Sequence, residues 1–153
     1  MSKQGIVAVN DSLFDEQIGF LMWDTTRKIS REFAVLIAKH QVNSGLVPFL
    51  RGLHQQEGLT QRELADLVQM RASTTLSALR ELERLKLIRR SNSRHDGRKN
   101  HVFLTERGRA LCATIVPEAK QFNRRLLRGI RGQEQRILRD LLRRMRDNMR
   151  PVP

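Results

Sequence analysis

The amino-acid sequence predicts a mainly α-helical protein with one small β-hairpin. Residues 12–40 and 105–150 carry apolar side chains three and four positions apart, which is the period of an amphipathic helix. Between these stretches, two short helical patterns are joined by a tight turn, and a turn signal at Asp96-Gly97 separates two strand-like runs. This order predicts a central lobe of short helices and a hairpin, flanked by long helices.

The first long stretch, residues 12–40, is expected to form one helix. Ser12 followed by Asp15 is a plausible start signal. One face then carries Ile18, Leu21, Met22, Thr25, Ile29, Phe33, Leu36 and Ile37. A second helix runs to about Gln56, and because Pro48 falls one turn into it, that helix must either kink or begin late.

Residues 59–86 predict a helix-turn-helix unit. Thr60 and Glu63 have the spacing of a capping box, in which each side chain accepts a hydrogen bond from the other residue's amide. A second helix begins near Ala72 and ends near Lys86. In such a pair the second helix normally enters the major groove of DNA, where Arg, Ser and Thr contact base edges or phosphates. The candidate DNA-binding residues here are Arg71, Ser73, Thr74, Ser77 and Arg80.

Residues 87–104 predict the hairpin, with strands at 87–92 and 101–104. Its loop carries Arg94, Arg98 and Lys99, which are suited to phosphate contact or to a narrow minor groove. Thr105 then opens another helix, in which Pro117 predicts a bend. A break at residues 129–132 precedes the last helix, whose two faces are apolar and arginine-rich.

The charge of the chain is strongly positive and unevenly distributed. The formal net charge is +13 and the isoelectric point is about 11.5. Residues 89–109 hold seven basic and two acidic side chains, and residues 120–153 hold eleven and three. A charge of this size points to a polyanionic partner, most often nucleic acid.

Several classes of protein are disfavoured by the same composition. The longest aliphatic run is five residues, Ala34 to Ala38, so no membrane span is expected, and the first nine residues do not resemble a signal peptide. A single cysteine, Cys112, excludes an internal disulfide and favours a reducing, cytoplasmic compartment. No metal-ligand spacing, cofactor motif or organised nucleophile is visible, so no metal, cofactor or enzymatic activity is expected.

These motifs, taken together, resemble the multiple-antibiotic-resistance regulator (MarR) family of winged helix-turn-helix transcription factors. The resemblance rests on the first helix of the pair at residues 59–66, and on Ser73-Thr74, Leu79 and Leu82-Glu83 in the second. It continues through the first wing strand at residues 87–90, the wing tip at Asp96 and Arg98, and the exit into the next helix at residues 104–109. The match covers about residues 42–112.

The resemblance implies one MarR-type domain over residues 1–153. Residues 43–104 would form a winged helix-turn-helix DNA-binding lobe, and residues 12–40 and 105–150 the helices of a homodimer. The expected partner is double-stranded DNA carrying a palindromic operator. Arg98 would enter the minor groove and Asp96 would orient it. Arg71 stands where the family often has a capping Asp, which replaces a helix cap by a cation near DNA.

Members of the family are mostly repressors released by small ligands, commonly aromatic acids, or by thiol oxidation. A small anionic aromatic acid or its coenzyme A thioester is therefore the implied effector, and Met22, Trp23, Arg27 and Phe49 are its candidate binding residues. Packing in the core or the dimer is the favoured alternative for Met22 and Trp23. A small buried residue is the favoured interpretation of Cys112, in preference to a sensor.

Two other functions remain open at this point. The charge of +13 is also compatible with a weakly specific architectural DNA-binding protein that needs no ligand. A winged helix can also serve as a scaffold for a protein adaptor, although the basic wing argues against this. The arginine face of the last helix could be solvated surface, flank DNA or hold a polyanionic effector, and solvated surface is the usual fate of a charge run.

Overall fold

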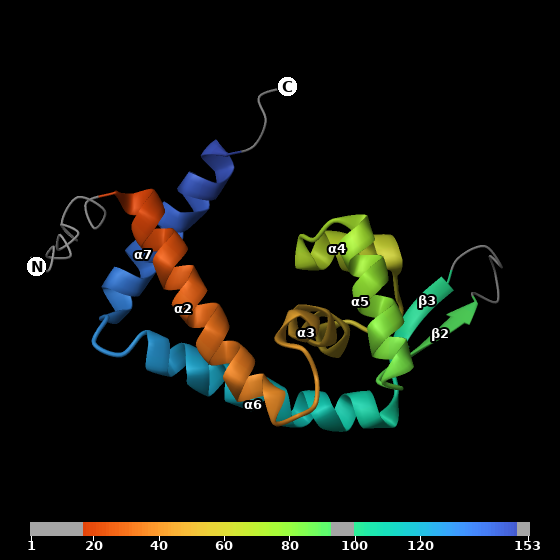
Figure 1. Cartoon of the computed structure of the whole chain (residues 1–153). Coiled ribbons are helices and arrows are strands. Elements are labelled where there is room, and N and C mark those ends of the chain that lie inside the picture. Colours follow the sequence, from red (N-terminus) through yellow and green to blue (C-terminus); the bar gives the residue numbers. More distant parts are fainter. Residues whose placement is uncertain (1–16, 93–99, 150–153) are drawn as a thin grey trace, which may run out of the picture. The chain divides into compact units, whose positions relative to one another are not determined.

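The computed structural model describes residues 17–92 and 100–149 (Figure 1). Its elements, in chain order, are α2 (Ile18–Ala38), the 3-10 helix η1 (Ser44–Leu46), α3 (Val47–Gln55), β1 (Leu59–Thr60), α4 (Gln61–Val68), α5 (Ala72–Arg84), β2 (Ile88–Asn92), β3 (Asn100–Leu104), α6 (Glu106–Leu126) and α7 (Gly132–Asn148). The chain divides into two compact units, residues 1–112 and 113–153, with the boundary inside α6. No helix of the described segments is long and apolar enough to cross a membrane.

The prediction of a mainly helical chain with a small β-hairpin is confirmed. Strands β2 and β3 pair antiparallel, with Ile88 opposite Leu104. A third strand, β1, joins the other edge of β3 and places Leu59 opposite Val102. The sequence pattern did not predict β1, because two residues are too few to show the alternation by which a strand is recognised.

The first described helix differs from its prediction. Gln17 has an extended backbone, with φ −87° and ψ 108°, so α2 begins at Ile18 and residues 12–40 do not form one continuous helix. The start signal at Ser12 and Asp15 lies outside the described residues. The helix ends at Ala38, and Gln41 follows in the left-handed region at φ 58°.

The second helix begins late, which was one of the two outcomes that Pro48 allowed. The side chain of Asn43 accepts a hydrogen bond of 2.7 Å from the amide of Gly45 and starts the short η1 turn. Pro48 then lies in the first turn of α3, where its missing N–H costs no helical hydrogen bond. The chain therefore turns before the proline and is not kinked by it.

The core of the first unit lies between α3, α4, α5 and the hairpin, which gather together in Figure 1. Its largest members are at most 2% exposed: Ile37, Phe49, Leu50, Leu53, Leu64, Leu79, Leu82, Leu87, Val102 and Leu104. Burying each such side chain contributes about 1.5–3 kcal/mol of transfer free energy. The capping box of Thr60 and Glu63 is present at the start of α4, as predicted.

A close junction connects the end of α5 to the start of α6. Lys86 is left-handed at φ 58°, and its carbonyl accepts a hydrogen bond of 2.8 Å from the hydroxyl of Thr105. The amide of Thr105 donates to the carbonyl of Leu87 at 3.0 Å. The Thr105 hydroxyl also accepts a hydrogen bond of 3.0 Å from the amide of Gly108, so Thr105 caps the start of α6, as predicted. Through its bonds to Lys86 and Leu87, Thr105 also connects α6 to the end of α5.

In the second unit, Pro117 lies inside α6, which ends at Leu126. Gly129 follows in the left-handed region at φ 82°, and α7 begins at Gly132, so the predicted helix break at residues 129–132 is confirmed. Glu134 accepts hydrogen bonds from the amide and the guanidinium of Arg131, at 2.7 and 2.8 Å. None of the residues of α7 is buried.

Candidate nucleic-acid interface and effector groove

Helix α5 presents a mainly polar surface with several arginines on its exposed side. One face of the helix packs into the core through Thr75, Ala78, Leu79 and Leu82. The residues predicted to contact DNA lie away from that face, and every one of them is exposed: Arg71, Ser73, Thr74, Ser77 and Arg80. The helical period therefore brings the predicted set together on one surface.

The start of α5 has no side-chain cap. Arg71 occupies the N-cap position and makes no capping hydrogen bond with its side chain. The turn before it is set by Gln69, which is left-handed at φ 55° and ends α4. The first amides of a helix lack intrahelical partners and carry partial positive charge, so this end of α5, with the Arg71 guanidinium beside it, favours an anion such as a phosphate.

The other polar side chains of α5 differ in whether they already have hydrogen-bond or ion-pair partners. The hydroxyl of Ser77 donates to the carbonyl of Ser73 at 3.1 Å, which leaves its oxygen lone pairs to accept from another donor. Arg80 makes no ion pair with any residue in the described ranges. It is therefore available for bidentate contact with guanine or with a phosphate.

The structure adds Arg84 to this surface. It lies one turn beyond Arg80 and is exposed, and its guanidinium donates to both carboxylate oxygens of Glu81 at 2.7 and 2.8 Å. The hydrogen bond from Arg84 lowers the pKa of Glu81 below its ordinary value. The spacing of four from Arg80 could have indicated Arg84 in the sequence, but the prediction stopped at Arg80.

The two arginines at the start of the wing have different roles. The side chain of Arg90 lies 3.2 Å from the carboxylate of Glu83 and joins β2 to α5. Arg89 is exposed on the opposite face of the strand, with its guanidinium 4.7 Å from the ring centroid of Phe103. The predicted wing-tip residues Arg94, Asp96, Arg98 and Lys99 lie outside the described residues.

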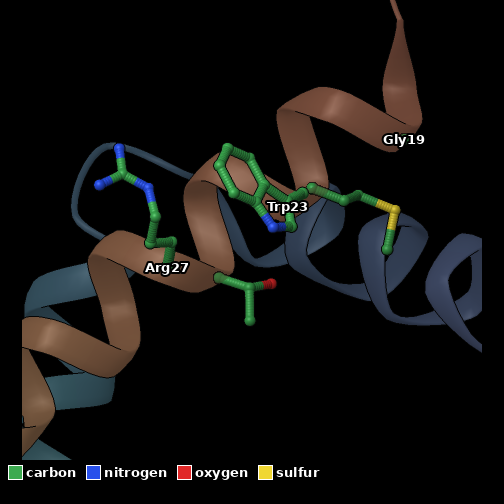
Figure 2. Close-up of a pocket in the computed structure, with 5 residues that line it drawn as sticks. Gly19, Trp23 and Arg27 are labelled. Atoms are coloured by element: carbon green, nitrogen blue, oxygen red, sulfur yellow. The ribbon is translucent and has the colours of Figure 1, made fainter.

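A shallow groove lies on the exposed side of α2 (Figure 2). It is lined by Gly19, Met22, Trp23, Thr26 and Arg27. Three of the four candidate effector residues are therefore neighbours in one groove. Phe49 does not line it, because this side chain is 1% exposed in the core of the first unit.

The groove combines an aromatic surface with a cation. Trp23 is 59% exposed, and the guanidinium of Arg27 lies 5.5 Å from its ring centroid. Asp24 accepts from Arg27 and from Lys28 at 2.7 Å each, and these hydrogen bonds, that of Lys28 foremost, lower the pKa of the Asp24 carboxyl. If Arg27 turned to an anionic ligand, Lys28 would still neutralise Asp24.

Cys112 lies in the core of the first unit. It is 1% exposed, and its thiol donates to the carbonyl of Leu50 at 3.6 Å. Burial, assisted by the charge of Glu57, raises the pKa of the Cys112 thiol to about 11. The thiolate is the reactive form of cysteine, and little of it is present at neutral pH. This environment matches the predicted packing role.

The chain was compared with known proteins. Residues 47–99 match the model of the MarR family. The HTH-type transcriptional regulator TtmR of Methylorubrum extorquens is 28% identical over 137 residues, which cover 88% of this chain and 68% of TtmR.

Two solved structures extend this likeness to the fold. A probable transcriptional regulator from Pseudomonas aeruginosa is 31% identical, with a TM-score of 0.72 over 86% of this chain and 98% of that one. BpsR of Bordetella bronchiseptica, whose DNA binding is regulated by 6-hydroxynicotinic acid, is 27% identical, with a TM-score of 0.79 over 88% and 96%. The helix pair, the wing strands and these likenesses lead to one assignment. The chain belongs to the MarR family of winged helix-turn-helix transcriptional regulators.

Proposed function

We propose that the protein is a homodimeric repressor that binds a palindromic DNA operator and is released by a small aromatic acid. The observation that carries the DNA-binding part is the exposed face of α5. This face combines a helix N-terminus without a side-chain cap, the exposed hydroxyls of Ser73, Thr74 and Ser77, and Arg80, which makes no ion pair within the described residues. Residues 43–104 would form the DNA-binding lobe, with Arg98 of the wing entering the minor groove. Residues 12–40 and 105–150 would form the dimer.

The dimer is supported by apolar side chains that a single chain leaves in water. On α7, Ile137, Leu138, Leu141 and Leu142 are between 39% and 53% exposed and share one face of the helix. On α2, Ile18 is 58% exposed and Leu21 46%. An exposed apolar face on a helix, such as that of α7, marks an interface, and two-fold symmetry of the protein would match a palindromic operator.

The experiment for DNA binding compares a specific duplex with a scrambled one. A palindromic duplex would be enriched from a random-sequence pool by the full chain, and its affinity measured by fluorescence anisotropy at several salt concentrations. We expect binding about 10³-fold tighter than to the scrambled duplex at physiological salt. Equal binding to both duplexes that vanishes as salt rises would favour the architectural alternative, for which the net charge of +13 is the supporting observation. No DNA binding even at low salt would favour the adaptor.

Arg71 provides a test in which stability and DNA affinity change in opposite directions. The Arg71→Asp substitution introduces a helix cap at the start of α5, and the unfolding free energy should rise by about 0.5–2 kcal/mol. The same change replaces a cation by an anion on the proposed DNA surface, so operator affinity should fall at least about tenfold. Urea unfolding and anisotropy measure the two effects. Arg71→Ala is the control, because it removes the cation without adding a cap; full operator affinity in both variants would remove Arg71 from the interface.

The groove on α2 supports the proposed effector. An aromatic ring can stack on exposed Trp23 while its carboxylate accepts from Arg27, which is the chemistry of an aromatic acid. The regulation of BpsR by 6-hydroxynicotinic acid provides a first ligand to test. Met22 would supply a polarizable side chain at the edge of the ring.

The chain has one tryptophan, so Trp23 fluorescence reports on this groove without interference. We expect 6-hydroxynicotinic acid or salicylate to quench this fluorescence in a saturable way and to release the operator over the same concentration range. Arg27→Gln should weaken binding about tenfold because the carboxylate loses its cation. Arg31→Gln, on the same helix but outside the groove, is the matched control. Quenching that is unchanged in Arg27→Gln would exclude this site.

A further inference from the structure

The strongest concentration of charge in the chain lies outside the helix-turn-helix. Residues 120–153 contain eleven basic and three acidic side chains, so at least eight cations of this segment have no acidic partner within it. From Lys120 to Arg131 there are five basic residues and no carboxylate. Every one of these five is exposed.

Ion pairs on α7 neutralise only part of its arginine face. Arg143 pairs with Asp140 at 3.1 Å and Arg146 with Asp147 at 3.4 Å. The other three arginines of the helix are exposed and make no ion pair with any residue in the described segments: Arg136, Arg139 and Arg144. We call these three residues the α7 arginine row.

The helix dipole stabilises few of these cations. Its favourable effect on positive charge is confined to the last turn of a helix. Only Arg146 occupies the last turn of α7, and Arg136 and Arg139 lie in its first half. Like charges three positions apart on a helix repel each other, at a cost of about 0.2–0.5 kcal/mol per pair. The row is therefore slightly destabilising to the helix unless an anion binds it.

The type of basic residue indicates the anion. Residues 120–153 use ten arginines and one lysine. Arginine binds phosphate through two parallel N–H donors, whereas lysine acts as a compact, strongly hydrated charge. A surface that served solubility alone would intersperse basic residues with acidic ones. The preference for arginine favours a partner made of phosphate groups.

The geometry of α7 keeps most of this face accessible when the apolar face is covered. At about 100° per residue, Arg136 and Arg139 lie on the side of the helix opposite Leu141 and Met145. Arg144 lies at the border of the apolar face, next to Ile137. Arg136 and Arg144 are about 12 Å apart along the helix axis, from a rise of about 1.5 Å per residue. That length corresponds to about three to four nucleotide steps of one DNA strand, at about 3.4 Å each.

We propose that the α7 arginine row is a second phosphate-binding surface, which contacts double-stranded DNA outside the half-sites read by α5 and the wing. This inference rests on the proposed function and extends it to the DNA flanking the operator. An anionic membrane surface is the less favoured partner, because α7 contains no aromatic residue to anchor in a lipid interface and its apolar face is assigned to the dimer. The surface contributes affinity without reading sequence.

The test uses the full chain and two duplexes that carry the same enriched palindrome. One duplex ends at the palindrome and the other continues for about one helical turn of arbitrary sequence on each side, about 10 base pairs. The variant R136Q/R139Q/R144Q neutralises the row, and R136K/R139K/R144K retains its charge. R31Q/R51Q/R107Q removes three exposed arginines from α2, α3 and the start of α6 and is the matched control for net charge.

Wild-type protein should bind the long duplex about tenfold more tightly than the short one, and the neutralised variant should lose this difference while remaining dimeric. The slope of log affinity against log salt on the long duplex should fall by about 1 for each phosphate contact removed. The lysine variant should keep most of the salt slope, and the control should keep the length dependence.

Three results would overturn the proposal: equal length dependence in wild type and the neutralised variant, an equal loss in the R31Q/R51Q/R107Q control, or a loss confined to binding of phosphatidylglycerol vesicles. The last result would assign the row to membranes. Failure of the proposed function is distinct, since wild-type protein would then bind the enriched and scrambled palindromes equally, whatever the state of the row.

Discussion

The Gly108→Ala substitution is expected to lower the unfolding free energy by about 2–4 kcal/mol. A Cβ at this position would overlap the backbone carbonyl of Leu87 and lie 3.3 Å from the side chain of Leu104. That carbonyl already accepts the amide of Thr105, so it cannot move away without breaking the junction between α5 and α6. The strain therefore exceeds the gain of about 0.5–1 kcal/mol that alanine normally brings to a helix.

Urea unfolding followed by circular dichroism, at one fixed protein concentration, measures this loss. The control is Gly132→Ala in the first turn of α7, where no atom lies within 4 Å of the new Cβ. This control should be neutral or stabilising by up to about 1 kcal/mol. Equal stability of Gly108→Ala and wild type would show that the α5–α6 junction is looser than its hydrogen bonds indicate. The junction also links the proposed DNA-reading helix to α6, so Gly108→Ala should weaken operator binding.

The Leu141→Glu substitution should convert the dimer into a folded monomer and reduce operator affinity at least about 100-fold. Leu141 is 46% exposed in the single chain, so glutamate costs the isolated α7 little. In the proposed dimer the same carboxylate would be buried between apolar side chains, which is strongly unfavourable. A monomer contacts only one half-site and loses the gain that comes from linking two binding events.

Light scattering after size-exclusion chromatography measures the mass, and anisotropy measures the affinity. Leu141→Met is the matched control, because it preserves an apolar side chain of similar volume and should leave both quantities unchanged. Far-ultraviolet circular dichroism verifies that Leu141→Glu is folded. A variant that remains dimeric with full operator affinity would place the dimer interface on another surface.

Local signals in the sequence were sufficient for most of the helix-turn-helix. The capping box of Thr60 and Glu63 depends on side chains three residues apart, and it forms as predicted. The exposed face of α5 follows from the period of 3.6 residues once its apolar positions are recognised. The break at residues 129–132 follows from two glycines, one of which takes the left-handed conformation that glycine adopts at little cost.

Predictions failed where the outcome depends on distant parts of the chain. The strand β1 exists because Leu59 and Thr60 find a free edge of β3, about forty residues away, and no local pattern records that pairing. Phe49 was among the candidate effector residues that the family resemblance implies, but packing in the first unit buries its side chain. The start of α2 at Ile18 was not predicted, because the spacing of apolar residues shows a helical pattern but does not show at which residue the helix begins. In the structure the backbone is extended at Gln17, directly before the helix.

The sequence by itself determined the order of the elements, the helix-turn-helix with its polar face, the concentration of arginine near the C-terminus and the family resemblance. These features depend on the spacing and identity of neighbouring residues, which the sequence states directly. Only the tertiary structure decided that Arg90 pairs with Glu83 while Arg89 stacks on Phe103, that Cys112 is buried with a raised pKa, and that Trp23 and Arg27 share a groove. Burial, ion pairing and the environment of a thiol depend on which surfaces meet after folding, and chain spacing does not specify those contacts.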